Sequence, residues 1–140
     1  MAIDRRHLGY TLPTFDVTVE PERLAEFAAA IGADAGSGLA PPTFMKAIEG
    51  EHGSSRAILE ALNVDLRRVL HAEQQFDYLV PIVAGERLSV SRSVTDLYEK
   101  KNGVMEFIVI ESVISKQDGS IAGRSRQVVL VRHPVTATAA

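Results

Sequence analysis

The second half of the chain alternates long β-type segments with tight-turn dipeptides, and this pattern constrains the fold more than any other feature. Apolar and polar residues alternate there as they do in strands with one buried face. Two dipeptides, Asn102-Gly103 and Asp118-Gly119, are strong hairpin signals. The segments that this pattern predicts to be strands are 74–80, 88–95, 104–116 and 121–132. The sequence therefore predicts a meander of long antiparallel strands.

The first half of the chain supplies the helices that can cover one face of this meander. A short strand over Phe15–Val19 precedes a helix that opens at Pro21, and its apolar residues recur at helical spacing up to Gly32. A flexible loop over 33–38 follows, and Thr43 then opens a central helix that runs to about Gly50. A further helical piece over 56–62 has Ser54 or Ser55 as its predicted cap. We expect an α+β domain in which a curved antiparallel sheet wraps around the central helix.

Composition narrows the class of protein. A chain of 140 residues fits one domain, and we expect its ends, 1–8 and 134–140, to be frayed. The net charge of −3 argues against nucleic-acid binding. The lack of cysteine excludes a thiolate nucleophile and a cysteine-based zinc site. The sequence shows neither a long apolar stretch nor a secretory signal, so we expect a cytoplasmic protein that does not enter a membrane.

Three stretches together carry a family resemblance that covers residues 9 to 132. Gly9-Tyr10-Thr11-Leu12-Pro13 resembles the opening of FAS1-like, MaoC-type dehydratase domains. Ala40-Pro41-Pro42-Thr43-Phe44 is similar to the entrance to the central helix of these domains. The stretch over 70–88, with Leu70-His71-Ala72-Glu73-Gln74-Gln75-Phe76 at its start, resembles their "LHGEQEF" signature. The resemblance implies a single hotdog domain over 1–140 that forms dimers.

The same resemblance implies a reaction. The family reversibly adds water to a trans-2-enoyl thioester and gives a (3R)-hydroxyacyl thioester, which places it in fatty acid metabolism as a lyase. An aspartate and a histidine hold the water and move the proton, and neither a metal nor an organic cofactor is required. Backbone amides at the start of the central helix polarise the thioester carbonyl, because a helix N-terminus favours developing negative charge. The implied ligand is an acyl-CoA or acyl-carrier-protein thioester, with Pro42, Thr43, Phe44, Glu73 and Gln74 as its expected contacts.

The loop that carries the family's catalytic pair departs from the pattern. Family members place an aspartate and a histidine about five positions apart between the first helix and the central helix. Here Asp34 can stand for the aspartate, but the position five residues later is Leu39, and no histidine lies between His7 and His52. The best remaining histidine is His71, in the "LHGEQEF"-like stretch. Asp34 and His71 are therefore the candidate catalytic residues of this chain.

Three functions remain open at this level. The first is a subunit of an (R)-specific enoyl-CoA hydratase or 3-hydroxyacyl-thioester dehydratase, whose incomplete Asp-x4-His motif suits the partner that shapes the acyl-binding tunnel. Such a chain pairs with itself or with a catalytic MaoC-like subunit. The second is a hotdog acyl-CoA thioesterase that uses Glu49 or Glu60 on a helix. The third is a non-catalytic module that binds acyl thioesters.

Overall fold

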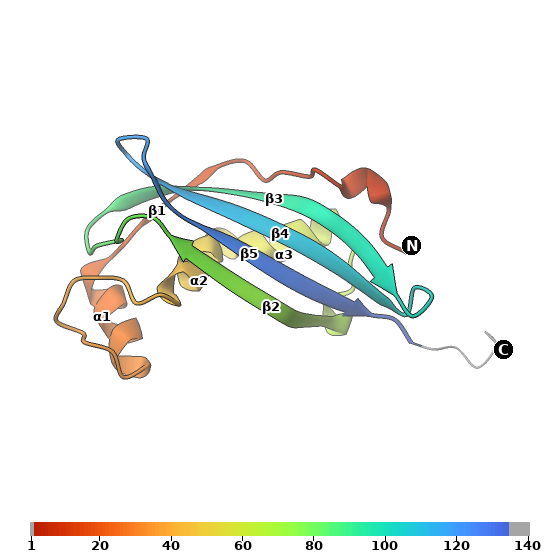
Figure 1. Ribbon diagram of the computed structural model, residues 1–140, viewed down its shortest axis with the longest axis horizontal. Coiled ribbons are helices and arrows are strands. Elements are labelled where there is room, and N and C mark those ends of the chain that lie inside the picture. Colours follow the sequence, from red (N-terminus) through yellow and green to blue (C-terminus); the bar gives the residue numbers. More distant parts are fainter. Residues whose placement is uncertain (1, 135–140) are drawn as a thin grey trace.

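The computed structural model describes residues 2–134, and within them a single five-stranded antiparallel sheet dominates (Figure 1). The strand order across the sheet is β1-β3-β4-β5-β2. The strands are β1 (Phe15–Thr18), β2 (Val69–Tyr78), β3 (Arg87–Lys100), β4 (Met105–Lys116) and β5 (Ile121–Arg132). The α-helices are α1 (Pro21–Ala30), α2 (Phe44–Glu49) and α3 (Ser54–Ala61). The predicted α+β hotdog fold is confirmed, but the meander has three strands, β3, β4 and β5, and not the expected four. The strand β2 lies at the far edge and pairs with β5 instead of β3.

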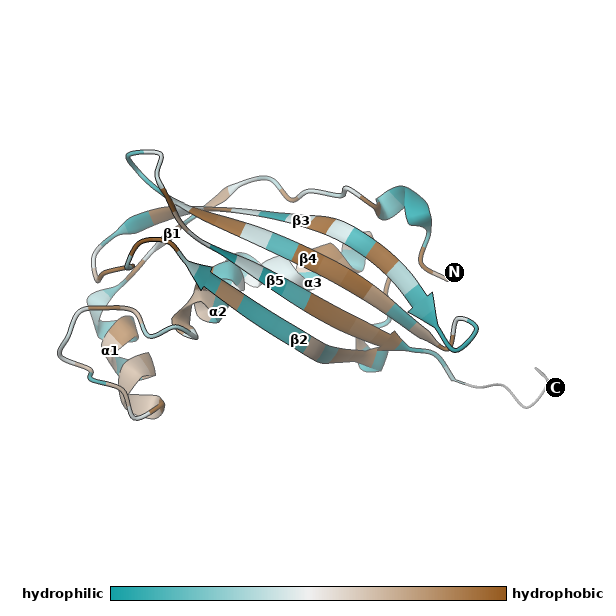
Figure 2. Ribbon diagram, in the orientation of Figure 1, coloured by the Kyte–Doolittle hydropathy of each residue, from teal (hydrophilic) through white to brown (hydrophobic). Residues whose placement is uncertain are grey.

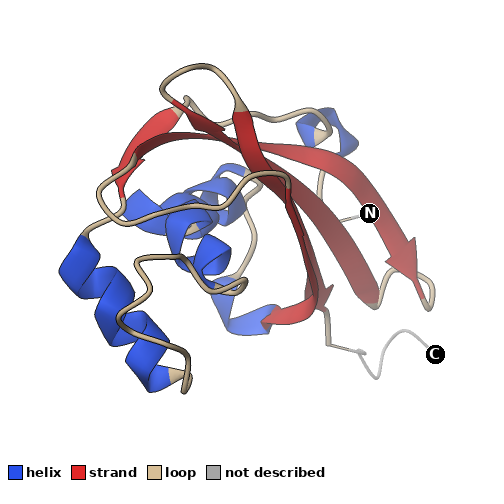
Figure 3. Ribbon diagram, turned by 60° about the vertical axis from the view of Figure 1, so that its left-hand side comes forward, coloured by secondary structure: helices blue, strands red, loops and turns tan. Residues whose placement is uncertain are grey.

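The sheet curves around the helices so that its concave face holds the core (Figure 3). Phe44, Met45 and Ile48 of α2 pack against strands β1, β3 and β4 in one buried cluster. Ile58 and Leu59 of α3 pack in a second cluster against β3, β4 and β5. Burial of these side chains, each worth roughly 1.5–3 kcal/mol, is what fixes α2 and α3 inside the sheet. The central helix is thus enclosed by the strands, as the sequence predicts.

The strand β4 is apolar on both faces, and the structure shows why. Ile108 and Ile110 face the helices, whereas Phe107 and Val109 belong to a small cluster on the outer face with Val128. Figure 2 shows the resulting apolar band in the middle strands of the sheet. Tyr98 stacks on Phe107 with 4.7 Å between ring centroids, which helps to cover this outer patch.

Several local expectations need correction. The strand β2 begins at Val69, five residues before the predicted start at Gln74, because its first part pairs with β5 across a bulge between His71 and Glu73. Neither serine caps α3. Its N-cap is Gly53, in the left-handed conformation, and the Ser54 hydroxyl donates to the Glu49 carbonyl instead.

The N-terminal segment, which the sequence predicts to be frayed, contacts β4 through residues 2 and 3. The buried carboxylate of Glu106 accepts hydrogen bonds from the backbone amides of Ala2 and Ile3, and His133 contacts the same carboxylate at 2.7 Å. Ile3 is only 4% exposed. A buried carboxylate requires such partners, and it therefore ties both ends of the chain to β4. The predicted frayed C-terminal end, apart from residue 134, lies outside the described residues.

Candidate functional site

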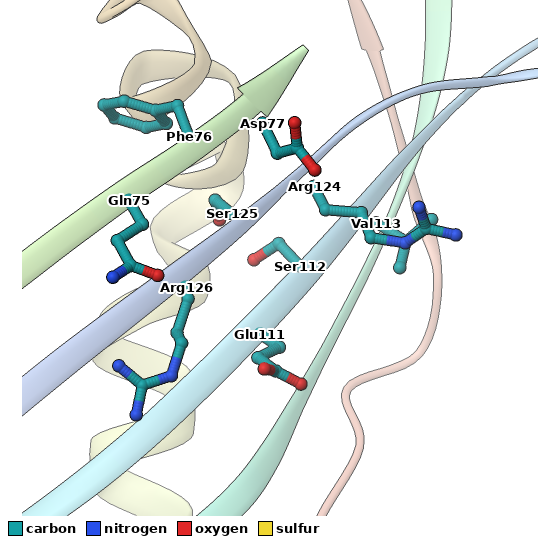
Figure 4. Close-up of a pocket in the computed structure, with 9 residues that line it drawn as sticks. All are labelled: Gln75, Phe76, Asp77, Glu111, Ser112, Val113, Arg124, Ser125 and Arg126. Carbon is teal, nitrogen blue, oxygen red and sulfur yellow. The ribbon is translucent and has the colours of Figure 1, made fainter. Parts of the chain in front are cut away.

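Two large depressions lie on opposite faces of the sheet beside β2. The outer one, of about 580 Å³, is lined largely by polar and charged side chains of β2, β4 and β5. Figure 4 shows Asp77, Glu111, Arg124 and Arg126 around it. The two carboxylates and two guanidinium groups offset one another in charge, so this surface selects neither an anion nor an apolar chain.

The inner cavity is the better candidate site. It has a volume of about 730 Å³ and lies between α1, α2 and β2. Its lining residues are Phe27, Thr43, Lys46, Ala47, His71, Gln74 and Phe76. Apolar walls with a few converging polar groups are typical of small-molecule sites. Three of the residues that the sequence points to, Thr43, His71 and Gln74, meet at this one cavity although they come from two separate elements.

A buried carboxylate organises the polar side of the cavity. Glu49, at the end of α2, is 0% exposed. Its Oε1 accepts a hydrogen bond from Gln74 Nε2 at 3.1 Å and lies 3.8 Å from Lys46 Nζ. Its Oε2 accepts from the hydroxyl of Ser125. Burial lowers the pKa of Lys46, and the charge of Glu49 opposes that change. The carboxylate therefore holds both an amide and an ammonium group at the cavity wall.

Behind Glu49 lies a second buried charge, Arg92 of β3, which is also 0% exposed. Its Nε donates to Ser112 at 2.9 Å, and its Nη2 donates to Gln127 Oε1 at 2.7 Å. Its Nη1 donates to the Glu49 carbonyl at 3.2 Å and to two serine hydroxyls at the start of α3. Burial lowers the pKa of Arg92, and Glu49 opposes that change. This network ties the α2–α3 junction to the sheet.

The start of α2 differs from the expected carbonyl-binding site. The amide of Phe44 donates to the Pro41 carbonyl at 2.9 Å, so it is already in use. The Tyr78 hydroxyl lies at the same end and donates to the Pro42 carbonyl at 3.0 Å. Burial raises the pKa of Tyr78 to about 12, against a smaller opposing hydrogen bond from the Met45 backbone. Tyr78, rather than a bare helix end, therefore occupies this position in the structure.

The other predicted site residues are dispersed. Asp34 is exposed and accepts a hydrogen bond from the Gly36 amide within its own loop, and it does not line the inner cavity. His71 lines the cavity, with Nε2 3.1 Å from the Glu73 carbonyl oxygen. Glu73 itself forms a 3.5 Å ion pair with Arg126 of β5. Asp34 and His71 therefore form no catalytic pair within the described residues, and their roles stay predictions.

Thr43 lines the inner cavity, whereas its two neighbours, Pro42 and Phe44, do not. Pro42 is exposed, and its carbonyl accepts from Tyr78. Phe44 is buried against Phe27, with 5.1 Å between ring centroids, and so forms part of the cavity's foundation rather than its lining. The predicted ligand contacts of these two residues remain untested.

Sequence reasoning did not anticipate the buried Glu49–Arg92 network. A glutamate on a short helix ordinarily lies on a solvated face. The sequence does hold one indication: alternation along the strand puts Arg92 on the same apolar face as Val90 and Val94. A charged side chain on a buried face requires buried hydrogen-bond partners. Because these partners come from α2, α3, β4 and β5, only the tertiary structure could identify them.

Comparisons with known proteins agree with this geometry. The family described as "FAS1-like, dehydratase domain region" matches residues 6–123. A UPF0336 protein of Thermobifida fusca is 33% identical over 150 aligned positions, which cover 94% of this chain and 95% of that protein. A UPF0336 protein of Streptomyces griseus is 34% identical over 109 positions, which cover 67% of this chain and 73% of that protein.

Solved structures share the fold at low identity. A chain of the HadBC (3R-hydroxyacyl-ACP dehydratase) complex of Mycobacterium tuberculosis has a TM-score of 0.73 at 18% identity, covering 89% of this chain and 96% of that chain. A chain of the ChsH1–ChsH2 complex of the same organism has a TM-score of 0.69 at 16% identity, covering 91% of this chain and 87% of that one. The helices of residues 2–134 include none that is long and apolar enough to cross a membrane. With the family match over most of its length and the enclosed central helix, the chain belongs to the FAS1-like dehydratase domain family of MaoC-like hotdog proteins.

Proposed function

We propose that this chain is the tunnel-shaping subunit of a heterodimeric (R)-specific enoyl-thioester hydratase, or 3-hydroxyacyl-thioester dehydratase. The observation that carries the proposal is the loop between α1 and α2. It holds an exposed Asp34 and no histidine, while an apolar cavity with converging polar groups lies next to it in the chain's fold. The chain therefore offers a place for an acyl thioester but lacks the family's proton-transfer pair.

The chemistry divides between two subunits in this proposal. Hydration forms a bond from a water oxygen to C3 of the enoyl thioester, and a proton from that water reaches C2. The partner's loop aspartate and histidine hold the water and move the proton, since histidine has a pKa suited to a relay near neutral pH. This chain contributes the walls of the inner cavity, which align the acyl group and exclude bulk water. Phe27, Ala47 and Phe76 supply its apolar surface.

The sheet provides an edge at which the partner can join. Within the described residues β2 pairs only with β5, so its other edge has no strand beside it. The opposite edge of the sheet is the strand β1, whose four residues offer a much shorter pairing edge than the ten residues of β2. Leu70 on β2 is 53% exposed. An unpaired strand with exposed apolar residues favours pairing with another chain, and a partner added there would lie beside the inner cavity.

The structural neighbours support an assembly of this kind. The HadBC and ChsH1–ChsH2 structures are complexes of two different chains by name, and the first is named as a 3R-hydroxyacyl-ACP dehydratase. Both share the fold with this chain at identities below 20%. The partner that we propose is a second hotdog chain with an intact Asp-x4-His loop, and the ligand is an acyl thioester of CoA or of a carrier protein.

The thioesterase alternative has less support. Glu49 has no exposed surface, and both of its carboxylate oxygens accept hydrogen bonds, so no water can reach it to be activated. Glu60 is 58% exposed and pairs with Arg56 on α3 at 2.8 Å, away from the inner cavity. We expect no release of free thiol from acyl-CoA by this chain. Release that Glu49→Gln abolishes would favour the thioesterase instead.

The test is a hydration assay with crotonyl-CoA, in which the reaction is measured as the loss of absorbance of the enoyl thioester. We expect no activity from the chain alone, and activity when it is co-purified with a hotdog chain that carries the complete loop. The matched control replaces the loop aspartate of that second chain with asparagine and should remove the activity without dissociating the complex. Full activity of this chain alone would show that it carries its own proton-transfer residues.

A further inference from the structure

The amide of Gln74 is held in one orientation at the wall of the inner cavity. Its Nε2 donates to Glu49 Oε1 at 3.1 Å. The NH₂ arm of the amide therefore faces Glu49, and the carbonyl arm points elsewhere. Glu49 cannot turn away, because Ser125 holds its other oxygen and it is fully buried.

The carbonyl arm of this amide has no partner. Gln74 Oε1 is the single buried side-chain nitrogen or oxygen atom within residues 2–134 that lacks a hydrogen bond. Nearly all buried polar atoms in folded proteins are paired, and an exception at a cavity indicates a missing water or ligand donor. Gln74 lines the inner cavity, and because Oε1 itself is buried, a ligand brings the donor by displacing the side chains that cover this atom.

Building on the function proposed above, we infer that Gln74 Oε1 accepts a hydrogen bond from the 3-hydroxyl group of a hydroxyacyl thioester. Glu49 acts as the positioning residue that directs this acceptor. A 3-hydroxyacyl thioester carries an O–H donor two carbons from its carbonyl acceptor, whereas a saturated acyl thioester carries the carbonyl alone. The cavity wall also carries a donor for the thioester carbonyl, the Lys46 ammonium, which lies 3.8 Å from the Glu49 oxygen that accepts from the Gln74 NH₂ group. Gln74 thus becomes a specificity-determining residue for the hydroxylated member of the substrate–product pair.

The experiment compares two ligands that differ only in this hydroxyl, (3R)-3-hydroxybutyryl-CoA and butyryl-CoA. Their dissociation constants are measured by calorimetry on the complex of this chain with its partner subunit, in which the partner's loop aspartate is replaced by asparagine so that no turnover occurs. For the wild-type chain we expect the hydroxylated ligand to bind about tenfold more tightly, as one additional hydrogen bond predicts. A ratio near one would overturn the inference without any variant.

Variants at adjacent positions then test the assignment. Gln74→Met should reduce the ratio to about one. Gln75→Met is the matched control, because the exposed Gln75 lies next in sequence but lines the outer depression on the other face of the sheet. It should leave the ratio unchanged. Thermal unfolding of each variant verifies that the chain is folded.

The outcomes separate this inference from the proposed function. If Gln74→Met weakens both ligands equally, Oε1 serves a pantetheine amide or a structural water, and the hydroxyl assignment is wrong. If Gln74→Met leaves the tenfold ratio intact, another group recognises the hydroxyl, and the inference is likewise wrong. If neither ligand binds and the unmodified complex does not hydrate crotonyl-CoA, the proposed function itself fails and the inference falls with it.

Discussion

Arg92→Met is the substitution that most directly tests how the core of this domain is held together. Arg92 has no exposed surface and donates to groups on α2, α3, β4 and β5. Methionine fills a similar volume, so the loss comes from polar groups and not from a cavity. The change removes the hydrogen-bond donors, whereas the ion pair between Lys46 and the Glu49 carboxylate stays in place.

The expected loss of stability depends on the buried acceptors that lose their Arg92 donor. A hydrogen bond from a charged group is worth about 1.5–3 kcal/mol, but serine hydroxyls can rotate toward other partners, so the separate values do not add. Each buried acceptor that loses its donor costs about 1–3 kcal/mol, and acceptors on four elements lose theirs at once. We therefore expect the free energy of unfolding to fall by about 3–5 kcal/mol. For a domain of this size that corresponds to a decrease in Tm of roughly 10–20 °C.

The assay is urea unfolding at fixed protein concentration, because assembly changes apparent stability. Arg124→Met is the matched control: this exposed arginine lies on β5, and its loss should change stability by no more than about 0.5 kcal/mol. In the double variant Glu49→Gln/Arg92→Met both charges are gone, and the combined loss should be less than the sum of the two single losses. A loss below about 1 kcal/mol for Arg92→Met would refute the reasoning from burial.

Three further predictions concern other parts of the molecule. The pKa of Tyr78 is raised from 10.0 for the free side chain to about 12 in the folded chain, so the folded state keeps this proton more tightly and stability is lost as pH rises from 10 to 12. Tyr78→Phe should reduce that loss in urea titrations across this range. Gly123→Ala should cost about 1–3 kcal/mol, because the new Cβ would lie 2.5 Å from a methionine methyl and 2.8 Å from a backbone carbonyl, whereas Gly36→Ala, whose nearest contact is at 3.4 Å, should change thermal stability little. Leu70→Lys should shift sedimentation toward the monomer, because it places a charge on the unpaired edge strand, whereas Leu8→Lys at the opposite side should not.

Each of these has a contradicting outcome. An unchanged alkaline limb for the tyrosine variant would show that its hydroxyl is not the group whose proton is retained. A glycine variant as stable as the parent would mean that the strand can move away from the helix at little cost. An edge variant that assembles like the parent would place the subunit contact elsewhere.

Much of the architecture follows from local pattern. Alternation and the Asn102-Gly103 and Asp118-Gly119 turns place β4 and β5 within a residue or two, because a hairpin links strands that are adjacent in sequence. The strand β3 runs on to Lys100, past the predicted end at residue 95, because its pairing with β4 continues beyond a bulge between Val94 and Asp96. The start of β2 was harder to place. Its first residues pair with β5 across a bulge, and that pairing depends on a strand more than fifty residues away.

The candidate site likewise has features that follow from local sequence and features that depend on contacts between distant elements. The family, the missing histidine and the residues around His71 and Gln74 could be inferred from the sequence, since these reside in contiguous motifs and in residue identity. The contact of Gln74 with Glu49, the place of Tyr78 at the start of α2 and the full burial of Arg92 emerged from the folded chain alone. Such contacts join elements distant in sequence, and their energies depend on burial and hydrogen-bond geometry, which no local pattern encodes.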